Sequence, residues 1–281
     1  MTIDLHTHSA VSDGTDPPGQ VVALAAQLGL RGLALTDHDT TAGWAEAEQA
    51  AHAHGVVLVP GVEMTCDGTH GQAHLLGYLV DPEDPELVQE MAWTRDDRVP
   101  RMQEMVRRLA ADGYPVTMDD VLVQAARSDT TLGRPHLADA LVAAGAFPDR
   151  AAAFAEVLND RTPYFVGHYA VDPLHGVALI RNAGGVPVLA HARARRVQPE
   201  SLIEAMAGAG LVGLEVDHPE HDEDDRARLR ELADALDLLV TAGSDYHGTG
   251  KAVRLGAEGI ADDDLEALLA AATGPTRPVL S

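Results

Sequence analysis

The chain is poor in cysteine, in lysine and in aromatic residues. Its 281 residues include one cysteine, Cys66, and one lysine, Lys251, and aromatic residues make up 4% of the sequence. A single cysteine forms no internal disulfide and leaves no cysteine-based zinc finger. No uncharged apolar run reaches the roughly 18 residues of a membrane span. The first residues lack the basic and apolar segments of a signal peptide, so we expect a cytoplasmic protein.

Positive charge is also scarce. The 44 acidic residues outnumber the 20 lysines and arginines, which gives a formal net charge of −24. Such a chain lacks the basic surface that duplex DNA or an anionic membrane needs, so we expect neither as a partner. Most of the acidic residues are expected to solvate loops and helix faces. Bound metal ions would still admit an anionic substrate, because an ion is often the largest local charge in a site.

Short apolar runs alternate with alanine-rich helical patterns. This alternation indicates βα units and a mainly parallel sheet. The expected strands are seven, at residues 3–6, 32–36, 56–62, 73–79, 186–190, 212–216 and 238–242. The sequence therefore predicts an α/β fold, either a barrel or a barrel-like wound sheet.

One long segment departs from this rhythm. Residues 93–165 show helical patterns and no good strand, with four short helices expected at 99–112, 118–127, 134–144 and 149–159. We therefore predict a barrel formed by residues 1–92 and 166–281, interrupted by a small all-helical insertion over residues 93–165. The insertion is expected to contribute to substrate binding.

The sequence has 14 histidines, and many of them lie with acidic residues where the expected strands end. His6 and His8 end the first strand, and residues two apart on a strand point the same way. Asp13 follows His8 by five residues, and His74 opens the fourth strand. The ends of other strands supply Asp37, His38, Glu63, His191, Asp245 and His247. Because sites in α/β sheets and barrels form at this rim, we expect these side chains to converge.

Six histidines and three carboxylates exceed the four ligands of one tetrahedral ion. They match two or three divalent ions that share a bridging carboxylate. Imidazole suits zinc and iron and carboxylates suit manganese, so we expect Mn²⁺, with Fe²⁺ or Zn²⁺ as alternatives. A lone His-X-His pair or a single Asp-His is common in turns and caps, and only the joint pattern favours a metal site. Such sites hydrolyse phosphate esters.

Six short segments of the chain resemble the motifs of the PHP (polymerase and histidinol phosphatase) metallohydrolases. The segments are His6-Thr7-His8-Ser9, Ser12-Asp13-Gly14, Leu35-Thr36-Asp37-His38, Gly61-Val62-Glu63, Leu189-Ala190-His191 and Gly243-Ser244-Asp245-Tyr246-His247-Gly248. They span nearly the whole chain in the order that the family has. The resemblance implies a distorted seven-stranded (β/α) barrel with a trinuclear metal site.

The resemblance also implies how the ligands are shared. The first ion would be held by His6, His8, Glu63 and Asp245. Glu63 would bridge to a second ion, whose other ligands would be His74 and His191. The third ion would be held by Asp13, His38 and His247, and Asp37 would orient a ligand histidine. The residues expected to act in catalysis are Asp13, His38, Glu63 and His191. The Asp13 position is histidine in some relatives, which leaves the identity of the metals open.

The insertion carries the segment Gly133-Arg134-Pro135-His136. This arrangement resembles the PHP subgroup that acts on nucleotides, including 3′,5′-nucleoside bisphosphate phosphatases and 5′–3′ oligoribonucleases. In that interpretation Arg134 and His136 hold a second phosphate, since the planar arginine fork suits phosphate. The alternative is that Arg134 begins a helix and His136 packs in the core. Further candidate substrate contacts are Arg193, Arg195, Arg196, His218 and His221.

We therefore expect a metal-dependent phosphoesterase that hydrolyses phosphate monoesters of nucleotides with a metal-activated hydroxide. The expected substrates are 3′,5′-nucleoside bisphosphates such as pAp, or the 5′ ends of short RNA. One alternative is a small-metabolite phosphatase of the histidinol phosphate type. Another is a non-catalytic metal-binding module, which the full set of nine ligand positions disfavours. The sequence leaves the oligomeric state and the balance between phosphatase and exonuclease open.

Overall fold

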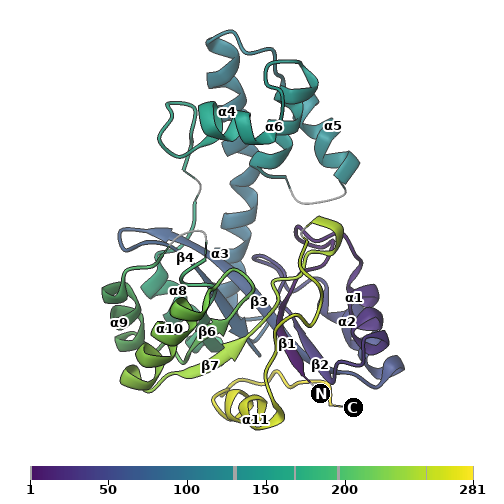
Figure 1. Ribbon diagram of the computed structural model, residues 1–281, viewed down its shortest axis with the longest axis vertical. Coiled ribbons are helices and arrows are strands. Elements are labelled where there is room, and N and C mark those ends of the chain that lie inside the picture. The colour runs from purple at the N-terminus through teal and green to yellow at the C-terminus, as the bar shows by residue number, and fades with distance from the viewer. Residues whose placement is uncertain (1, 129–131, 168, 195–196, 251, 281) are drawn as a thin grey trace. The chain divides into compact units, whose positions relative to one another are not determined.

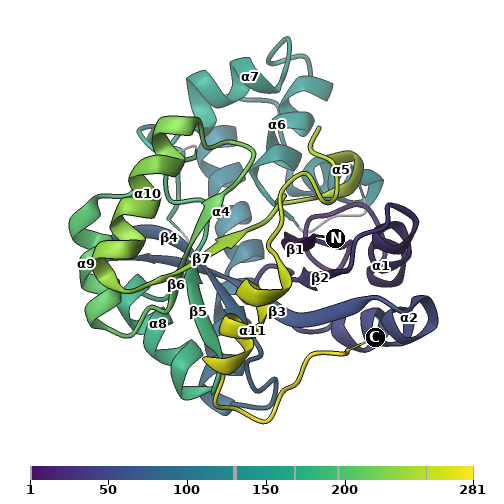
Figure 2. The same cartoon turned by 60° about the horizontal axis from the view of Figure 1, so that its bottom comes forward.

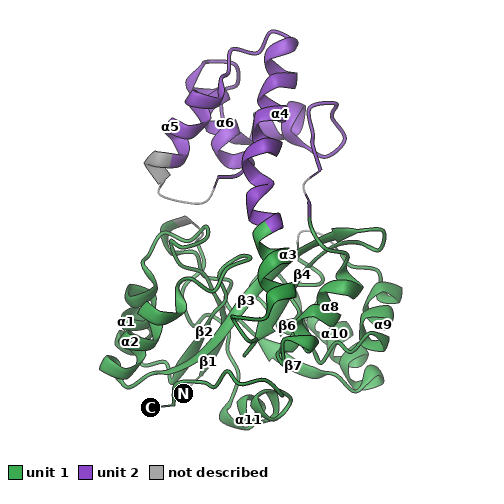
Figure 3. Ribbon diagram, turned by 180° about the vertical axis from the view of Figure 1, so that it is seen from behind, with its two compact units in different colours: residues 1–92, 170–281 green, residues 93–169 purple. Residues whose placement is uncertain are grey.

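The computed structural model describes residues 2–128, 132–167, 169–194, 197–250 and 252–280. Two of the candidate substrate contacts, Arg195 and Arg196, lie outside these residues. The chain divides into two compact units, one formed by Met1–Ala92 with Ala170–Ser281 and the other by Trp93–Tyr169 (Figure 3).

The larger unit is built on one sheet whose strands follow the chain order (Figure 1). Its seven strands are β1 (Ile3–Thr7), β2 (Gly32–Leu35), β3 (Val57–Gly68), β4 (Gly71–Tyr78), β5 (Val186–Leu189), β6 (Gly213–Asp217) and β7 (Leu239–Ala242). The predicted α/β fold is confirmed. The sheet is mixed, because β4 runs antiparallel to both β3 and β5 while the other neighbours are parallel.

The two edge strands, β1 and β7, do not form a continuous ladder in the described part of the chain. A single parallel bridge joins Thr7 to Tyr246, and the His8 N–H donates to the Tyr246 carbonyl at 2.8 Å. The barrel is therefore distorted, and it is closed at this seam by the loop that follows β7 rather than by strand pairing.

Helices pack on the outside of these strands. The helices of the larger unit are α1 (Pro18–Gln27), α2 (Trp44–His54), α3 (Pro85–Asp96), α8 (Pro173–Asn182), α9 (Glu200–Gly208), α10 (Glu223–Leu236) and α11 (Asp262–Ala270), with a 3₁₀ turn at Gly248–Gly250. Helix α3 crosses the boundary between the units. The carboxylates of Asp172 and Asp222 accept backbone N–H groups at the starts of α8 and α10, which satisfies orphan donors there.

The larger unit has two apolar clusters, one outside the strands and one inside. Leu33 and Leu58 belong to the outer cluster with the helices, and their neighbours Ala34 and Val59 belong to the inner one. This alternation follows from the period of two in a strand. Helix α11 adds its leucines to the inner cluster and lies across one end of it (Figure 2).

The side chains of β3 and β4 that face the interior change from apolar to polar along each strand. On β3 the apolar Val57 and Val59 are followed, at the same parity, by Glu63. On β4 the apolar Tyr78 and Leu76 are preceded at the same parity by His74. The same faces that fill the interior therefore present a carboxylate and an imidazole farther along.

The smaller unit is helical and has a core of its own. Its helices are α4 (Arg98–Ala111), α5 (Met118–Ser128), α6 (Arg134–Ala143) and α7 (Arg150–Ala153), and α7 continues as a π-helix over Phe154–Leu158. Buried side chains such as Met105, Leu109, Leu137 and Leu141 form the core. Among the helices of both units, within the described residues, none is long and apolar enough to cross a membrane.

A buried hydrogen bond links β4 to β1 across the interior. The Tyr78 hydroxyl donates to the Leu5 carbonyl at 2.9 Å, and the Tyr78 side chain is fully buried. We expect Tyr78→Phe to lower the free energy of unfolding by about 1–2 kcal/mol, because it removes a buried hydrogen bond. Chemical denaturation measures this loss. The control is Tyr164→Phe, whose hydroxyl bonds to Asp112 at the surface. An equal loss in both variants would contradict the prediction.

Candidate metal centre

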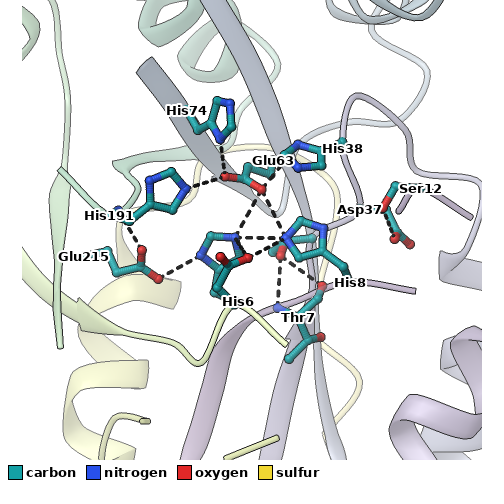
Figure 4. Close-up of polar contacts among 12 residues, drawn as sticks. His6, Thr7, His8, Ser12, Asp37, His38, Glu63, His74, His191 and Glu215 are labelled. Atoms are coloured by element: carbon teal, nitrogen blue, oxygen red, sulfur yellow. Dashed lines mark hydrogen bonds and ion pairs between the residues drawn. The ribbon is translucent and has the colours of Figure 1, made fainter. Parts of the chain in front are cut away.

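The nine residues that the sequence singles out as ligands lie together in the larger unit. Figure 4 shows His6, His8, His38, His74 and His191 around Glu63. Three groups of their ligand atoms converge: His6, His8, Glu63 and Asp245; His8, Asp13, His38 and His247; and His38, Glu63 and His74. His191 joins through its Nε2, which lies 3.0 Å from Glu63 Oε1. The nine side chains thus form one connected cluster at the ends and inner faces of the strands.

The first group has the spacing of ligands around one ion. His6 Nε2 lies 3.1 Å from His8 Nε2, 3.2 Å from Glu63 Oε2 and 3.6 Å from Asp245 Oδ1. His8 Nε2 lies 3.1 Å from Glu63 Oε2 and 3.3 Å from Asp245 Oδ1. Four ligand atoms about 2.05 Å from an ion in a tetrahedron lie about 3.3 Å apart. The donor types and the spacing of this group therefore fit a divalent ion.

The carboxylate of Glu63 faces two sets of imidazoles. Its Oε2 lies toward His6, His8 and His38, with the His38 Nδ1 at 3.3 Å. Its Oε1 lies 2.8 Å from His74 Nδ1 and 3.0 Å from His191 Nε2. A carboxylate with one oxygen toward each of two ligand sets has the geometry of a bridge between two ions.

The third group lies at the open side of the cluster. Asp13 Oδ1 is 3.2 Å from His247 Nε2, and Asp13 Oδ2 is 3.8 Å from His38 Nε2. The buried Nδ1 of His8 has no hydrogen-bond partner in the described structure and lies 3.7 Å from Asp13. The His247 Nδ1–H donates to the Asp245 carbonyl at 2.8 Å. That bond leaves the lone pair of the His247 Nε2 facing Asp13, where it can bind a metal.

The carboxylates of the cluster are held in their charged form. Burial alone would raise the pKa of Glu63, but the rings of His38, His6 and His74 hold it well below its usual range. Burial opposes ionisation of Asp245 and Asp13 too, and neighbouring histidines lower the pKa of both. Since metals bind deprotonated carboxylates, the cluster already holds these ligands in the form that binds.

The structure corrects two expected positions, because the sequence predicts Glu63 at the end of the third strand and His74 at the opening of the fourth. Glu63 lies in the middle of β3, opposite Leu76, and His74 lies within β4, opposite Thr65. The reason is that β3 and β4 form a long antiparallel hairpin that extends past the end of β2. The carbonyl of Glu63 accepts the N–H of Asp39, just after β2, so the middle of β3 is level with that strand's end.

Asp37 also has a different place from the one that the resemblance implies. Its carboxylate accepts the Ser9 N–H at 2.8 Å, the Ser9 hydroxyl at 2.7 Å and the Ser12 hydroxyl at 2.7 Å. These bonds fix the loop that follows β1 and carries Asp13. Asp37 therefore orders a loop, and no bond from it to a ligand histidine is found in the described structure.

One buried carboxylate was missed by the sequence analysis. Glu215, on β6, accepts the His6 Nδ1–H at 2.9 Å through Oε1 and the His191 N–H at 2.7 Å through Oε2. His191 has φ of 30°, in the left-handed region that costs a non-glycine residue about 1–3 kcal/mol. Glu215 thus orients the ring of one candidate ligand and pins the strained backbone of another. The only signal in the sequence was an acidic residue inside an apolar strand.

Gly243 makes room for this arrangement. A Cβ at this position would lie 2.3 Å from the His6 Cβ and 3.0 Å from Glu215 Oε1. Any larger residue would therefore displace the first ligand and its carboxylate partner. This close approach explains why a glycine precedes Ser244 and Asp245 after β7.

Two of the candidate substrate contacts of the larger unit, Arg193 and His221, bond to the protein itself. The His221 Nδ1–H donates to the Val216 carbonyl, and its Nε2 accepts the Arg193 N–H. The Arg193 Nε donates to Asp225 at 2.6 Å. The His218 Nδ1 accepts the Glu220 N–H, whereas its buried Nε2 has no hydrogen-bond partner among the described residues and lies 3.6 Å from Asp245 Oδ2. Arg134 and His136 belong to the smaller unit.

Comparison with known proteins identifies the family. The PHP domain model matches residues 4–87. The chain is 34% identical to a 3′,5′-nucleoside bisphosphate phosphatase of Chromobacterium violaceum, over 90% of this chain and 89% of the relative. The chain belongs to the PHP family.

Further PHP relatives carry other names. A phosphoribosyl 1,2-cyclic phosphate 1,2-diphosphodiesterase of Eggerthella lenta is 35% identical over 88% of this chain and 95% of the relative. A 5′-3′ exoribonuclease of Haemophilus influenzae is 31% identical over 87% of this chain and 89% of the relative. A solved structure from Bifidobacterium adolescentis, described as a candidate metal-dependent phosphoesterase, matches with a TM-score of 0.85 and 40% identity over 97% of both chains.

Membership of the PHP family and the cluster of histidine and carboxylate ligands support bound divalent metal ions. Each of the nine ligand positions offers a nitrogen or an oxygen that such ions accept.

We expect Glu215→Gln to weaken metal binding about 10–100-fold, as loss of a partner that orients a ligand typically does. One amide cannot accept both N–H groups, because its NH₂ would face a donor. Competition against a chelating dye measures the affinity of the folded protein. The control is Glu258→Gln, since Glu258 bonds to Arg226 at 2.6 Å away from the ligands. Unchanged affinity in Glu215→Gln would contradict the role of this carboxylate.

Proposed function

We propose that this PHP protein is a metal-dependent phosphoesterase that removes phosphate from nucleotides. Its proposed substrates are 3′,5′-nucleoside bisphosphates such as pAp, or the 5′ ends of short RNA. The observation that carries the proposal is the Glu63 carboxylate, whose two oxygens face separate sets of imidazoles. Paired metal sites of this kind suit displacement at phosphorus.

The names of the relatives support a phosphorylated substrate. The three relatives are a nucleoside bisphosphate phosphatase, a cyclic phosphate diesterase and an exoribonuclease. Hydrolysis of a phosphoester bond is common to all three activities. A nucleotide or an oligonucleotide is the substrate in two of them, and we adopt that class here.

The exposure of the ligands indicates the side from which a substrate enters. His6 and His8 are fully buried, whereas the side chains of Asp13 and His74 are 39% and 36% exposed and that of His191 is 23% exposed. The buried pair holds the inner end of the cluster. The exposed ligands form its open rim, so we propose that the phosphate binds between them.

We propose three bound ions, with Mn²⁺ preferred. The inner group His6, His8, Glu63 and Asp245 would hold one ion. Glu63 with His74 and His191 would hold the second, and Asp13 with His38 and His247 the third. When bound, such ions lower the pKa of a water molecule and offset charge on the phosphoryl oxygens. Without them three ionised carboxylates would repel a phosphate, so the ions are also needed for substrate binding.

In the smaller unit we propose Arg134 and His136 as contacts for a second phosphate. The Arg134 guanidinium donates to the Leu158 carbonyl at 3.1 Å and lies over the rings of Phe154 and Phe165. These contacts hold the planar fork in a fixed direction, and we propose that its other N–H groups donate to an anion. The His136 Nδ1 accepts the Gly133 N–H, so a neutral His136 carries its proton on Nε2 as a donor.

The proposed activity is tested by assaying the manganese-loaded protein against pAp and 5′-phosphorylated short RNA. We expect release of phosphate or of mononucleotides from at least one substrate. We also expect the activity to disappear with a chelator and to return with Mn²⁺. Histidinol phosphate and phosphoribosyl 1,2-cyclic phosphate serve as the competing substrates. Turnover of either of these, with none of pAp or RNA, would replace the proposed substrate class.

The proposed phosphate contact is tested by Arg134→Ala. We expect the KM for pAp to rise about 10–100-fold, which corresponds to loss of a charge-assisted hydrogen bond. The control is Arg150→Ala in the same unit, because Arg150 is paired with Asp139. Steady-state kinetics of both variants give the comparison. A KM for Arg134→Ala no higher than that of the control would remove Arg134 from the substrate site.

A further inference from the structure

The ring of His218 is buried beside the candidate metal ligands. The residue is 2% exposed, and its ring centroid lies 5.5 Å from that of His191. Its Nε2 lies 3.6 Å from Asp245 Oδ2 and has no hydrogen-bond partner among the described residues. A buried polar atom without a partner typically costs about 1–3 kcal/mol. Such an atom next to a metal centre requires an explanation.

An irregularity in β6 turns His218 toward the cluster. The pairing of β6 with β7 shifts its register between Glu215 and Asp217. Before the shift, Glu215 faces the cluster and bonds to His6. After the shift, Asp217 accepts a bond at 2.6 Å from Arg230 of the outer helix α10. The next residue, His218, therefore faces the cluster, and irregularities of this kind often re-aim a side chain next to an active site.

The hydrogen bond of the other ring nitrogen determines what the His218 Nε2 can do. The Nδ1 accepts the Glu220 N–H at 3.1 Å. An N–H donates only to a nitrogen with a free lone pair, so the neutral ring carries its proton on Nε2. A metal ion binds the lone pair of an imidazole nitrogen. The His218 Nε2 is therefore a donor that faces the cluster and not a tenth metal ligand.

The burial of this nitrogen also argues against the substrate contact that the sequence suggests. A phosphate arriving from solvent meets the exposed Asp13 and His74 first. The acceptor that faces the His218 Nε2 is instead Asp245 Oδ2. The other oxygen of that carboxylate, Oδ1, lies 3.3 Å from His8 Nε2 in the first ligand group. Asp245 thus has one oxygen toward the ligands and one toward His218.

We propose that His218 is a positioning residue, which donates from its Nε2–H to Asp245 Oδ2 when Oδ1 binds a metal ion. The proposal rests on metal binding by the cluster, which the proposed function requires. The present separation is a few tenths of an ångström longer than a hydrogen bond, so a small rotation of the carboxylate forms the bond. The bond gives the buried donor a partner and aims Oδ1 at the ion, as Glu215 aims the ring of His6.

Two substitutions separate the donor of His218 from its shape. His218→Gln keeps an N–H donor and loses the ring, whereas His218→Phe keeps a ring and loses the donor. Both lose the acceptor of the Glu220 N–H, so that loss cancels in the comparison. We expect His218→Phe to weaken Mn²⁺ binding about 10–100-fold, as loss of a partner that orients a ligand typically does. We expect His218→Gln to retain most of the wild-type affinity.

Competition against a chelating dye measures these affinities. Equal affinities of the two variants, or tighter binding by His218→Phe, would overturn the proposal, because the ring and not the donor would then matter. Far-UV circular dichroism of the metal-free variants checks that they fold. If His218→Phe does not fold, His218→Met takes its place, since methionine has nearly the length of glutamine and no N–H donor.

A double-mutant cycle tests whether His218 acts through Asp245. His218→Phe is introduced into the wild-type protein and into Asp245→Ala, which removes the acceptor. We expect the loss of Mn²⁺ affinity to be much smaller in the Asp245→Ala background, because two residues that act through one contact are not additive. The control is His54→Phe, the same substitution at an exposed position of α2, which should leave the affinity unchanged. An equal loss from His218→Phe in both backgrounds would overturn the proposal.

The two proposals fail in different ways. If the wild-type protein binds Mn²⁺ and hydrolyses neither pAp nor RNA, the proposed function fails, and the affinity measurements still decide the role of His218. If pAp is hydrolysed and His218→Phe binds Mn²⁺ as tightly as His218→Gln, the function stands and the positioning role falls.

Discussion

The burial of the Glu63 carboxylate is the constraint on which the rest of the site depends. A charged carboxylate that is 1% exposed would be strongly destabilising without partners, because burial in a low dielectric removes its hydration. Five imidazoles supply those partners, and they come from four separate segments: His6 and His8, His38, His74 and His191. Each segment must therefore arrive at one point, and the strand order of the barrel brings them there. Bound cations would complete the neutralisation that the rings begin.

The positions of the strands along the chain could be predicted because the periodicity of apolar residues is local, whereas the antiparallel direction of β4 could not. The candidate ligands could be proposed because imidazoles and carboxylates recur near strand ends, and the structure brings all nine together. The lengths of β3 and β4 could not be predicted. Their polar ends at Asp67 and Gln72 look like loop, and only antiparallel pairing with each other extends them.

Other features depend on contacts between residues far apart in the sequence. Glu215 meets His6 across 209 residues, and nothing around it in β6 indicates that partner. The place of Asp37 beside Ser9 and Ser12 depends on how the loop after β1 folds back. His221 follows a strand like a ligand, yet its ring bonds to backbone groups of its own unit. A sequence pattern indicates which chemistry is available at each of these positions but not which atoms it meets.

The pairing of β4 with β5 has a consequence for how this protein can vary. Antiparallel neighbours need only a short turn between them, and here the chain between them includes a complete helical unit. That unit begins and ends at Trp93 and Tyr169, whose rings touch. Because its ends are already close, a longer, shorter or unrelated segment could be exchanged there at little cost in loop entropy. The nine candidate ligands all lie outside the exchanged segment, so such a change would leave their cluster in place.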